Sequence, residues 1–252
     1  MAGGLKVGVV LLWGISAQAQ AVVSVQAGLI HFTEGEVYLD AEPIRATPET
    51  FFSLKDGQVL RTGQGRAELL LGPEVFLRLG SQGSLRMENN RLDETRVELQ
   101  KGTALVELVE TIKRGQIQIA EGETRTELKA WGLYRFDADH GELSVFGGAA
   151  HVTAGNQKAA AGRGRAVQLT GALPTSKFDN KDADGLERWA ARRSFELFVS
   201  SAEARAARTD WEFTVTGWVW NRNFNMRFFS GVAAAEHRRR HASADREQTG
   251  LR

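Results

Sequence analysis

Residues 56–80 read DGQVLRTGQGRAELLLGPEVFLRLG, and this stretch predicts the fold of the 252-residue chain. Within Val75–Leu79 apolar residues occupy every second position, with Phe76 and Arg78 between them. Side chains of a β-strand point alternately to opposite faces, so the pattern indicates a strand with one face on a core. Glycines separate such runs, and we expect them to supply the positive φ angles of tight turns.

The same pattern extends outward to about Leu29 and Leu169. Both Arg96–Gln100 and Gln116–Ile119 alternate polar and apolar residues at each step. Strands at roughly 8 to 12 residue spacing with turn signals between them predict an all-β domain over residues 27–172, built as a β-solenoid or a sandwich-like stack of short strands. The expected strands are 35–40, 58–62, 67–71, 75–79, 84–88, 96–100, 104–109, 116–120, 124–129, 133–137, 143–146, 151–153 and 166–169.

Composition narrows the classes of function. Apolar residues make up 42% and charged residues 25% of the chain, so neither wholesale disorder nor a multi-span membrane protein is expected. The net charge of +1 gives no basic surface for nucleic acid. The chain has no cysteine, which excludes a lipid-anchored cysteine and a disulfide scaffold.

Residues 1–19 have the pattern of a signal peptide. Lys6 precedes the apolar stretch Val7–Ala17, and Ala17-Gln18-Ala19 has the small-x-small form of a cleavage site. We expect cleavage after Ala19 and a periplasmic or cell-envelope location. The alternative is an uncleaved membrane anchor, although the apolar stretch is shorter than the roughly 20 residues that span a bilayer.

A single amphipathic helix is expected within residues 179–208. Leu186, Trp189 and Leu197 recur at helical spacing, and acidic residues before them favour a helix N-terminus. We expect the Trp189 side of the helix to pack on the β domain. The arginines of this region are expected to face solvent, namely Arg192, Arg193, Arg205 and Arg208.

The acidic stretch before this helix also resembles half of a calcium-binding loop. Asn180–Gly185 matches the first half of the D-x-[DN]-x-[DN]-G-x5-E pattern, but position 12 of the loop is Ala191 instead of a bidentate Glu. Helix capping by the aspartates is the favoured interpretation over calcium binding. The five histidines show no paired metal-ligand spacing and are expected to lie mostly at the surface, so no metal site is predicted.

An aromatic segment over residues 209–230 is the candidate binding region. Its tentative binding residues are Trp211, Trp218, Trp220 and Phe224, because exposed aromatic patches mark contact surfaces for proteins or sugars. The alternative is that these residues close the core, since Trp211–Val215 alternates like a half-buried strand. Residues 231–252 form a basic tail that is predicted to be disordered and solvated, with anionic lipid or wall polymer as a less favoured partner.

No pattern in the sequence supports catalysis. Gly63-Gln64-Gly65 lacks the third glycine and the helix of a phosphate-binding loop, and nucleophile-elbow and Walker patterns are absent. A divergent hydrolase would need clustered carboxylates in a cleft. The candidates Asp137, Asp139 and Glu142 are expected to be solvated in a turn. We therefore expect no enzyme activity, no catalytic residues and no cofactor.

Four motifs in register resemble the FecR domain family. They are Glu34–Val37 (E-G-x-V), Asp56–Gly63 (with G-x-x-L-R-T-G), Gly65–Leu69 (R-A-E-L) and Val75–Gly80 (x-x-L-R-L-G), and the resemblance covers about Ala27–Val152. The resemblance implies a periplasmic, solenoid-like β domain, known as the sensing part of membrane-bound anti-sigma regulators of iron uptake. It implies no catalytic residues.

The sequence departs from those regulators at its N-terminus. They carry a cytoplasmic anti-sigma segment before a transmembrane helix, whereas only Met1–Leu5 precede Lys6 here. We therefore expect no direct contact with a sigma factor. The expected function is that of a non-enzymatic exported envelope protein that binds a protein partner or a cell-wall glycan. The alternative is a membrane-anchored periplasmic component of a signalling or regulatory system, which would contact the membrane only through an uncleaved N-terminal segment.

Overall fold

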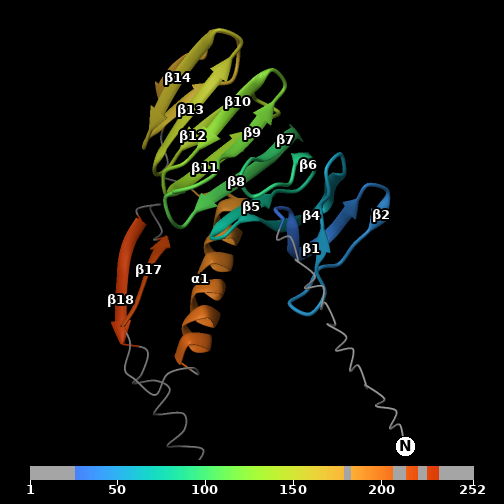
Figure 1. Cartoon of the computed structure of the whole chain (residues 1–252), viewed down its shortest axis with the longest axis vertical. Coiled ribbons are helices and arrows are strands. Elements are labelled where there is room, and N and C mark those ends of the chain that lie inside the picture. The colour runs from blue at the N-terminus through green and yellow to red at the C-terminus, as the bar shows by residue number, and fades with distance from the viewer. Residues whose placement is uncertain (1–25, 179–182, 207–213, 221–225, 233–252) are drawn as a thin grey trace, which may run out of the picture.

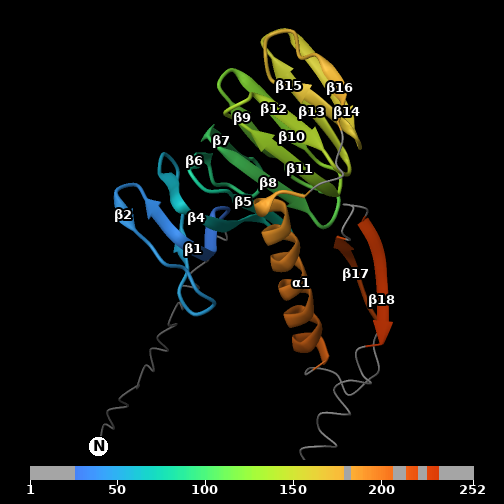
Figure 2. The same cartoon turned by 180° about the vertical axis from the view of Figure 1, so that it is seen from behind.

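The computed structural model describes residues 26–178, 183–206, 214–220 and 226–232 (Figures 1 and 2). In this part of the chain the protein is all-β with one helix, α1 (Gly185–Ala206), which confirms the predicted fold class. The first strands are β1 (Leu29–Leu39), β2 (Glu42–Pro43), β3 (Phe52–Ser53), β4 (Val59–Gly72), β5 (Val75–Leu79), β6 (Ser84–Asn89), β7 (Thr95–Lys101), β8 (Thr103–Leu108) and β9 (Ile117–Glu121). They are followed by β10 (Thr124–Leu128), β11 (Gly132–Asp137), β12 (Glu142–Val145), β13 (Ala149–Ala154), β14 (Gln157–Gly162), β15 (Arg165–Gln168), β16 (Thr175–Lys177), β17 (Thr214–Trp220) and β18 (Met226–Val232).

Strands β1 to β16 form one hydrogen-bonded sheet that doubles back on itself at the long strand β4. The first part of β4 pairs with β6 and its second part with β5, so the sheet divides there into two layers. Layer A contains β6, β7, β9, β10, β13 and β14, and layer B contains β5, β8, β11, β12, β15 and β16. Strand β1 runs along β4 over most of its length.

The chain alternates between these layers as it proceeds. After β8 in layer B, the β9–β10 pair lies in layer A, the β11–β12 pair in layer B, β13–β14 in layer A and β15–β16 in layer B. Most neighbouring strands are antiparallel, and the contact between β7 and β9 is parallel. Each further turn of the chain therefore lengthens both layers, which is the stacked arrangement of short strands expected from the sequence.

The main core lies between the two layers. In β5 the side chains of Val75, Leu77 and Leu79 are buried in it, and the same alternation places Tyr134 and Phe136 of β11 there. Burying one such side chain contributes about 1.5–3 kcal/mol relative to leaving it exposed. The outer face of layer B carries the intervening residues of these strands.

The boundaries of the strands correct two details of the sequence prediction. Residues 58–62 and 67–71 were expected to be separate strands joined by a glycine turn, but both lie in the continuous strand β4. Gly65 has no positive φ. It is needed because a Cβ there would lie 2.4 Å from the carbonyl oxygen of Glu36, where β1 crosses close to β4. The structure also contains β14, for which the sequence prediction had no strand.

The helix packs on the outer face of layer B, and the chain beyond it forms a two-stranded hairpin of β17 and β18. Both views place this hairpin beside α1 (Figures 1 and 2). Among the described residues, α1 is not long and apolar enough to cross a membrane.

Candidate functional site

Buried charged groups lie on the surface of the sheet against which α1 packs. We call this surface the α1 seat. Its apolar part is a second core cluster, separate from the main core, in which Leu186, Trp189 and Ala190 of the helix contact Leu105 and other residues of layer B. Positions 186, 189, 190, 193 and 194 follow the helical period and so share one face of α1. The charged residues of the sheet in the α1 seat are Glu34, Arg66, Glu68, Arg78, Glu107 and Arg135.

The helix begins with a capping box. The backbone N–H of Glu187 donates to Oδ1 of Asp184 at 2.8 Å, and the backbone N–H of Asp184 donates to Oε2 of Glu187 at 2.9 Å. This geometry confirms the capping role expected for Asp184. Residues 179–182 of the calcium-loop pattern lie outside the described residues, and the described residues contain no group of three or more His, Cys, Asp or Glu suited to a metal ion.

Arg135 of β11 links this helix cap to the sheet through two ion pairs. Its Nη1 lies 2.5 Å from Oδ2 of Asp184 and 3.0 Å from Oε1 of Glu187. Burial raises the pKa of Glu187 above its ordinary value. Burial acts in the same direction on Asp184, but the backbone N–H of Glu187 and the Arg135 guanidinium outweigh it, so the pKa of Asp184 is lowered. The helix terminus is therefore held by charge as well as by apolar contact.

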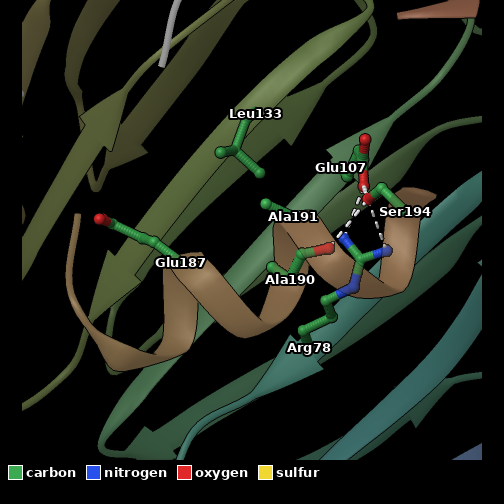
Figure 3. A pocket seen from close by; sticks show the side chains of 7 residues that line it. All are labelled: Arg78, Glu107, Leu133, Glu187, Ala190, Ala191 and Ser194. Atoms are coloured by element: carbon green, nitrogen blue, oxygen red, sulfur yellow. Dashed lines mark hydrogen bonds and ion pairs between the residues drawn. The ribbon is translucent and has the colours of Figure 1, made fainter. Parts of the chain in front are cut away.

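A fully buried arginine lies under the third turn of the helix (Figure 3). Arg78 Nε donates to Glu68 at 2.6 Å, and Arg78 Nη1 donates to Glu107 at 2.5 Å. Nη2 donates to the hydroxyl of Ser194, which itself donates to Glu107 at 2.6 Å. Burial disfavours the guanidinium, but the carboxylates of Glu107 and Glu68 prevail and raise the pKa of Arg78. Arg78 is thus charged, and each of its three guanidinium nitrogens has a hydrogen-bond partner at this interface.

Arg193 brings a second guanidinium from the helix to the same carboxylate. Its Nη2 and Nε donate to Oε1 of Glu68 at 2.8 and 3.1 Å, and its guanidinium carbon lies 3.9 Å from the ring centroid of Phe32. The side chain is 12% exposed. The expectation that Arg193 faces solvent is therefore wrong, because Glu68 offers it a buried carboxylate.

Trp189 of the helix contacts two charged residues of the sheet, Glu34 and Arg66. Its indole N–H donates to Oε2 of Glu34 at 2.8 Å, and Arg66 lies 5.8 Å above its ring. The residue is 2% exposed, which confirms that the Trp189 side of the helix packs on the β domain. A Cβ at Gly80 would lie 3.1 Å from Leu186, so glycine there permits the close approach of the helix.

A β-bulge in β1 adds a histidine to the same surface. Ile30 pairs with Leu69 and Phe32 with Glu68, so His31 is the additional residue between them. Its Nε2 lies buried 3.3 Å from Oε1 of Glu68, without the geometry of a hydrogen bond. His31, with 17% of its side chain exposed, is thus an exception to the expectation that the histidines lie mostly at the surface, whereas His140 is 79% exposed.

The cavity beside Arg78 limits what the site can do chemically. It has a volume of about 10 Å³ and is lined by Arg78, Glu107, Leu133, Glu187, Ala190, Ala191 and Ser194 (Figure 3). That volume is about the minimum for one water molecule. The charged and apolar contacts around this small cavity suit the attachment of a helix.

The predicted binding residues lie partly in the hairpin. Trp218 and Trp220 belong to β17, where they pair across the hairpin with Phe228 and Met226 of β18. Four other predicted features lie outside the described residues, namely Trp211, Phe224, the cleavage site at Ala19 and the tail at 233–252. Asp137, Asp139 and Glu142 lie around the exposed His140 at the turn between β11 and β12. Asp137 contacts His140, Asp139 accepts from the N–H of Gly102, and Glu142 accepts from Gln168.

Sequence reasoning did not find the α1 seat, although its residues stand in the quoted motifs. Arg66 and Glu68 belong to the R-A-E-L motif, Arg78 and Gly80 to the x-x-L-R-L-G motif, and Glu34 to E-G-x-V. The available signal was that charges of opposite sign, such as Glu68 and Arg78, face away from the core on the adjacent strands β4 and β5. The helix that buries them lies more than one hundred residues later in the chain.

Comparisons with known proteins give structural similarity only. No protein-family model matches the chain, and no curated protein matches it. Two crystal structures of proteins described as proposed anti-sigma factors from Parabacteroides distasonis ATCC 8503 are similar to it. The first is 13% identical with a TM-score of 0.38 and covers 52% of this chain, which spans 61% of the length of that protein. The second is 12% identical with a TM-score of 0.39 and covers 77% of this chain and 92% of the other.

Proposed function

We propose that the chain is an exported, non-enzymatic envelope protein of the FecR-like type, in which α1 connects a rigid β domain to an aromatic contact segment at residues 209–230. The segment would bind a protein partner or a cell-wall glycan. The observation that carries this proposal is the charged attachment of α1, through Arg78, Glu68 and Arg193, to the outer face of layer B.

The position of the helix contacts supports this assignment of the contact segment. The apolar and charged contacts of the α1 seat involve helix residues from Leu186 to Ser194, whereas α1 continues to Ala206. The chain then leads to β17, which carries Trp218 and Trp220. Tryptophan combines a large apolar area with a polar N–H, which suits contacts to both proteins and sugars.

The test compares aromatic substitutions at two places on the full mature chain. The double variant Trp218→Ala/Trp220→Ala removes two aromatics of the contact segment, and Phe51→Ala removes a 62% exposed aromatic from the β domain as a matched control. Binding is measured by co-sedimentation with purified cell-wall sacculi and by cross-linked capture from envelope extract. We expect the double variant to lose binding in one of the two assays and Phe51→Ala to retain it. Equal binding by both variants would refute the assignment of the contact segment.

Export is tested separately, by mass spectrometry of the N-terminus of the protein isolated from its native cell. A chain beginning at Gln20 supports the secreted form. A chain beginning at Met1 and recovered with the membrane supports the alternative, an anchored component of a signalling system.

A further inference from the structure

The β-bulge at His31 places a titratable ring inside a charge cluster that spans two separate parts of the fold. His31 comes from β1, and the groups that face it come from β4, β5 and α1. They are the carboxylate of Glu68 at 3.3 Å and the guanidinium groups of Arg78 and Arg193. The ring of Phe76 lies 6.1 Å away, centroid to centroid. Glu107 of β8 completes the cluster through Arg78.

Among the described residues, the charges of the buried part of this cluster balance when His31 is neutral, and the 59% exposed Glu196 of α1 lies outside that part, 2.6 Å from Nη1 of Arg193. Arg78 and Arg193 supply two positive charges, and Glu68 and Glu107 supply two negative charges. A proton on His31 would add a third cation to a site where both oxygens of Glu68 already have guanidinium partners, Arg193 at Oε1 and Arg78 at Oε2. An added charge in a buried, balanced cluster is unfavourable because water cannot solvate it.

We propose that α1 is a pH-responsive latch, docked on layer B at neutral pH and released when His31 gains a proton. This inference is independent of the proposed function, because it concerns the contact between helix and sheet and not the partner of the contact segment. Release would free the chain that leads to β17.

The direction of the effect follows from the environment of His31 in the docked state. Burial lowers the pKa of His31, and Arg193 and Arg78 lower it further against the opposing effect of Glu68. Releasing α1 removes Arg193, together with the exposed Glu196 that pairs with it, and part of the burial, so the undocked state binds the proton more tightly. Acidification from pH 6.5 downward therefore favours the undocked state, and the docking constant is unchanged above this range.

Release of the helix is separable from unfolding of the sheet. The main core between the layers contains no residue of α1, whereas the cluster between the helix and the sheet is a distinct set of six buried residues, three of them from α1. The contact between helix and sheet also relies on ion pairs, which depend on the charge state of their members. The β domain can thus remain folded when α1 leaves.

The absence of cysteine in the chain allows a direct measurement. Spin labels are attached at Lys101→Cys on β7 and Arg192→Cys on α1, both at exposed positions, and the distance between them is measured by pulsed electron paramagnetic resonance on full-length mature protein from pH 8 to pH 5. We expect a second, longer distance to grow in as the pH falls below 6.5. The ratio of undocked to docked protein should rise about tenfold for each unit by which the His31 pKa differs between the two states.

Three variants decide whether His31 is responsible. His31→Gln stays neutral at every pH, and we expect its distance distribution to be constant between pH 7 and pH 5. His31→Phe serves the same purpose if the glutamine variant does not fold, because the site already contacts an aromatic ring. The control His140→Gln alters a histidine in the turn after β11 and should keep the wild-type response. The proposal is overturned if wild type keeps a single distance down to pH 5, or if both His31 variants respond as wild type does.

Discussion

Arg78 Nε lies 2.6 Å from Oε2 of Glu68, and the two side chains are 1% and 0% exposed. Strands β4 and β5 present this pair on the outer face of layer B, where α1 covers it. A buried ion pair contributes little net stability compared with apolar residues of the same shape, but removing one partner leaves an unpaired buried charge. Loss of either charge of this pair is therefore expected to lower the stability of the folded sheet.

Arg78→Met should destabilise the protein by roughly 3–5 kcal/mol, because it leaves the carboxylates of Glu68 and Glu107 buried without their guanidinium. The free energy of unfolding is measured by urea denaturation at pH 7. The matched control is Arg86→Met, which removes a 43% exposed arginine paired with Glu98 at 3.0 Å and should cost no more than about 1 kcal/mol. Equal losses in the two variants would mean that the buried pair has no special role.

Asp184→Ala should weaken the docking of α1, because it removes the cap on the N–H of Glu187 and a partner of Arg135. The loss of an N-cap costs about 0.5–2 kcal/mol. The expected result is faster amide hydrogen exchange in residues 185–195 and unchanged exchange in β11. In Asp93→Ala, which removes an exposed carboxylate from a loop, exchange in the helix should stay at the wild-type rate. Unchanged exchange in Asp184→Ala would show that Arg135 and the apolar contacts are enough to keep the start of α1 docked.

Gly65→Ala should destabilise the fold by roughly 1–3 kcal/mol or more, because its Cβ would lie 2.4 Å from the carbonyl oxygen of Glu36. Both neighbouring segments are backbone of paired strands and cannot move aside independently. Gly162→Ala is the matched control, since a Cβ there meets nothing within 4 Å and its φ is not positive. Thermal unfolding followed by circular dichroism should show a lower Tm for the first variant and an equal or higher Tm for the second. A Tm for Gly65→Ala equal to that of wild type would contradict the close approach of β1 and β4.

Glu121→Gln should change the pH dependence of stability in a defined direction. Burial, with a smaller contribution from Asp137, raises the pKa of Glu121 to about 8, and its two carboxyl oxygens are buried without a hydrogen-bond partner. The folded state therefore holds a proton that the unfolded state releases near pH 4.5. The stabilisation is complete below pH 4.5 and is lost as the pH rises through about 8.

We expect wild type to lose roughly 1 kcal/mol per pH unit relative to Glu121→Gln between about pH 5 and pH 8. Urea denaturation at a series of pH values measures this difference. Glu123→Gln changes an exposed carboxylate two residues away and should follow the wild-type curve. Parallel curves for wild type and Glu121→Gln would show that Glu121 ionises normally in the folded protein.

The sequence predicted the strands well because alternation is a local property. In β7 and β10 the buried residues are those that the period of two assigns to one face. It could not predict that β4 continues through Gly63 and Gly65, because glycine signals a turn and a close crossing of backbones equally well. The distinction depends on Glu36 of β1, which lies on another strand.

The α1 seat could be predicted only in part. Helical spacing identified Trp189 as the packed face, and the acidic residues before the helix identified its cap. Arg193 was assigned to solvent because its partner Glu68 is 125 positions away in sequence. His31 was missed for a different reason, since a bulge shifts the alternation by one residue and no local pattern announces it.

The alternation of hairpins between the two layers has a consequence for how related chains can differ in length. The charged residues of the α1 seat come from β1, β4, β5, β8 and β11, whereas β15 and β16 lie at the far end of layer B from β4. Inserting one more hairpin in each layer would move that far end by about 10 Å, given the spacing of neighbouring strands. The segment between Lys177 and Gly185 would then need about three additional residues to bring the helix back. The length of this return segment should therefore grow in step with the number of hairpins.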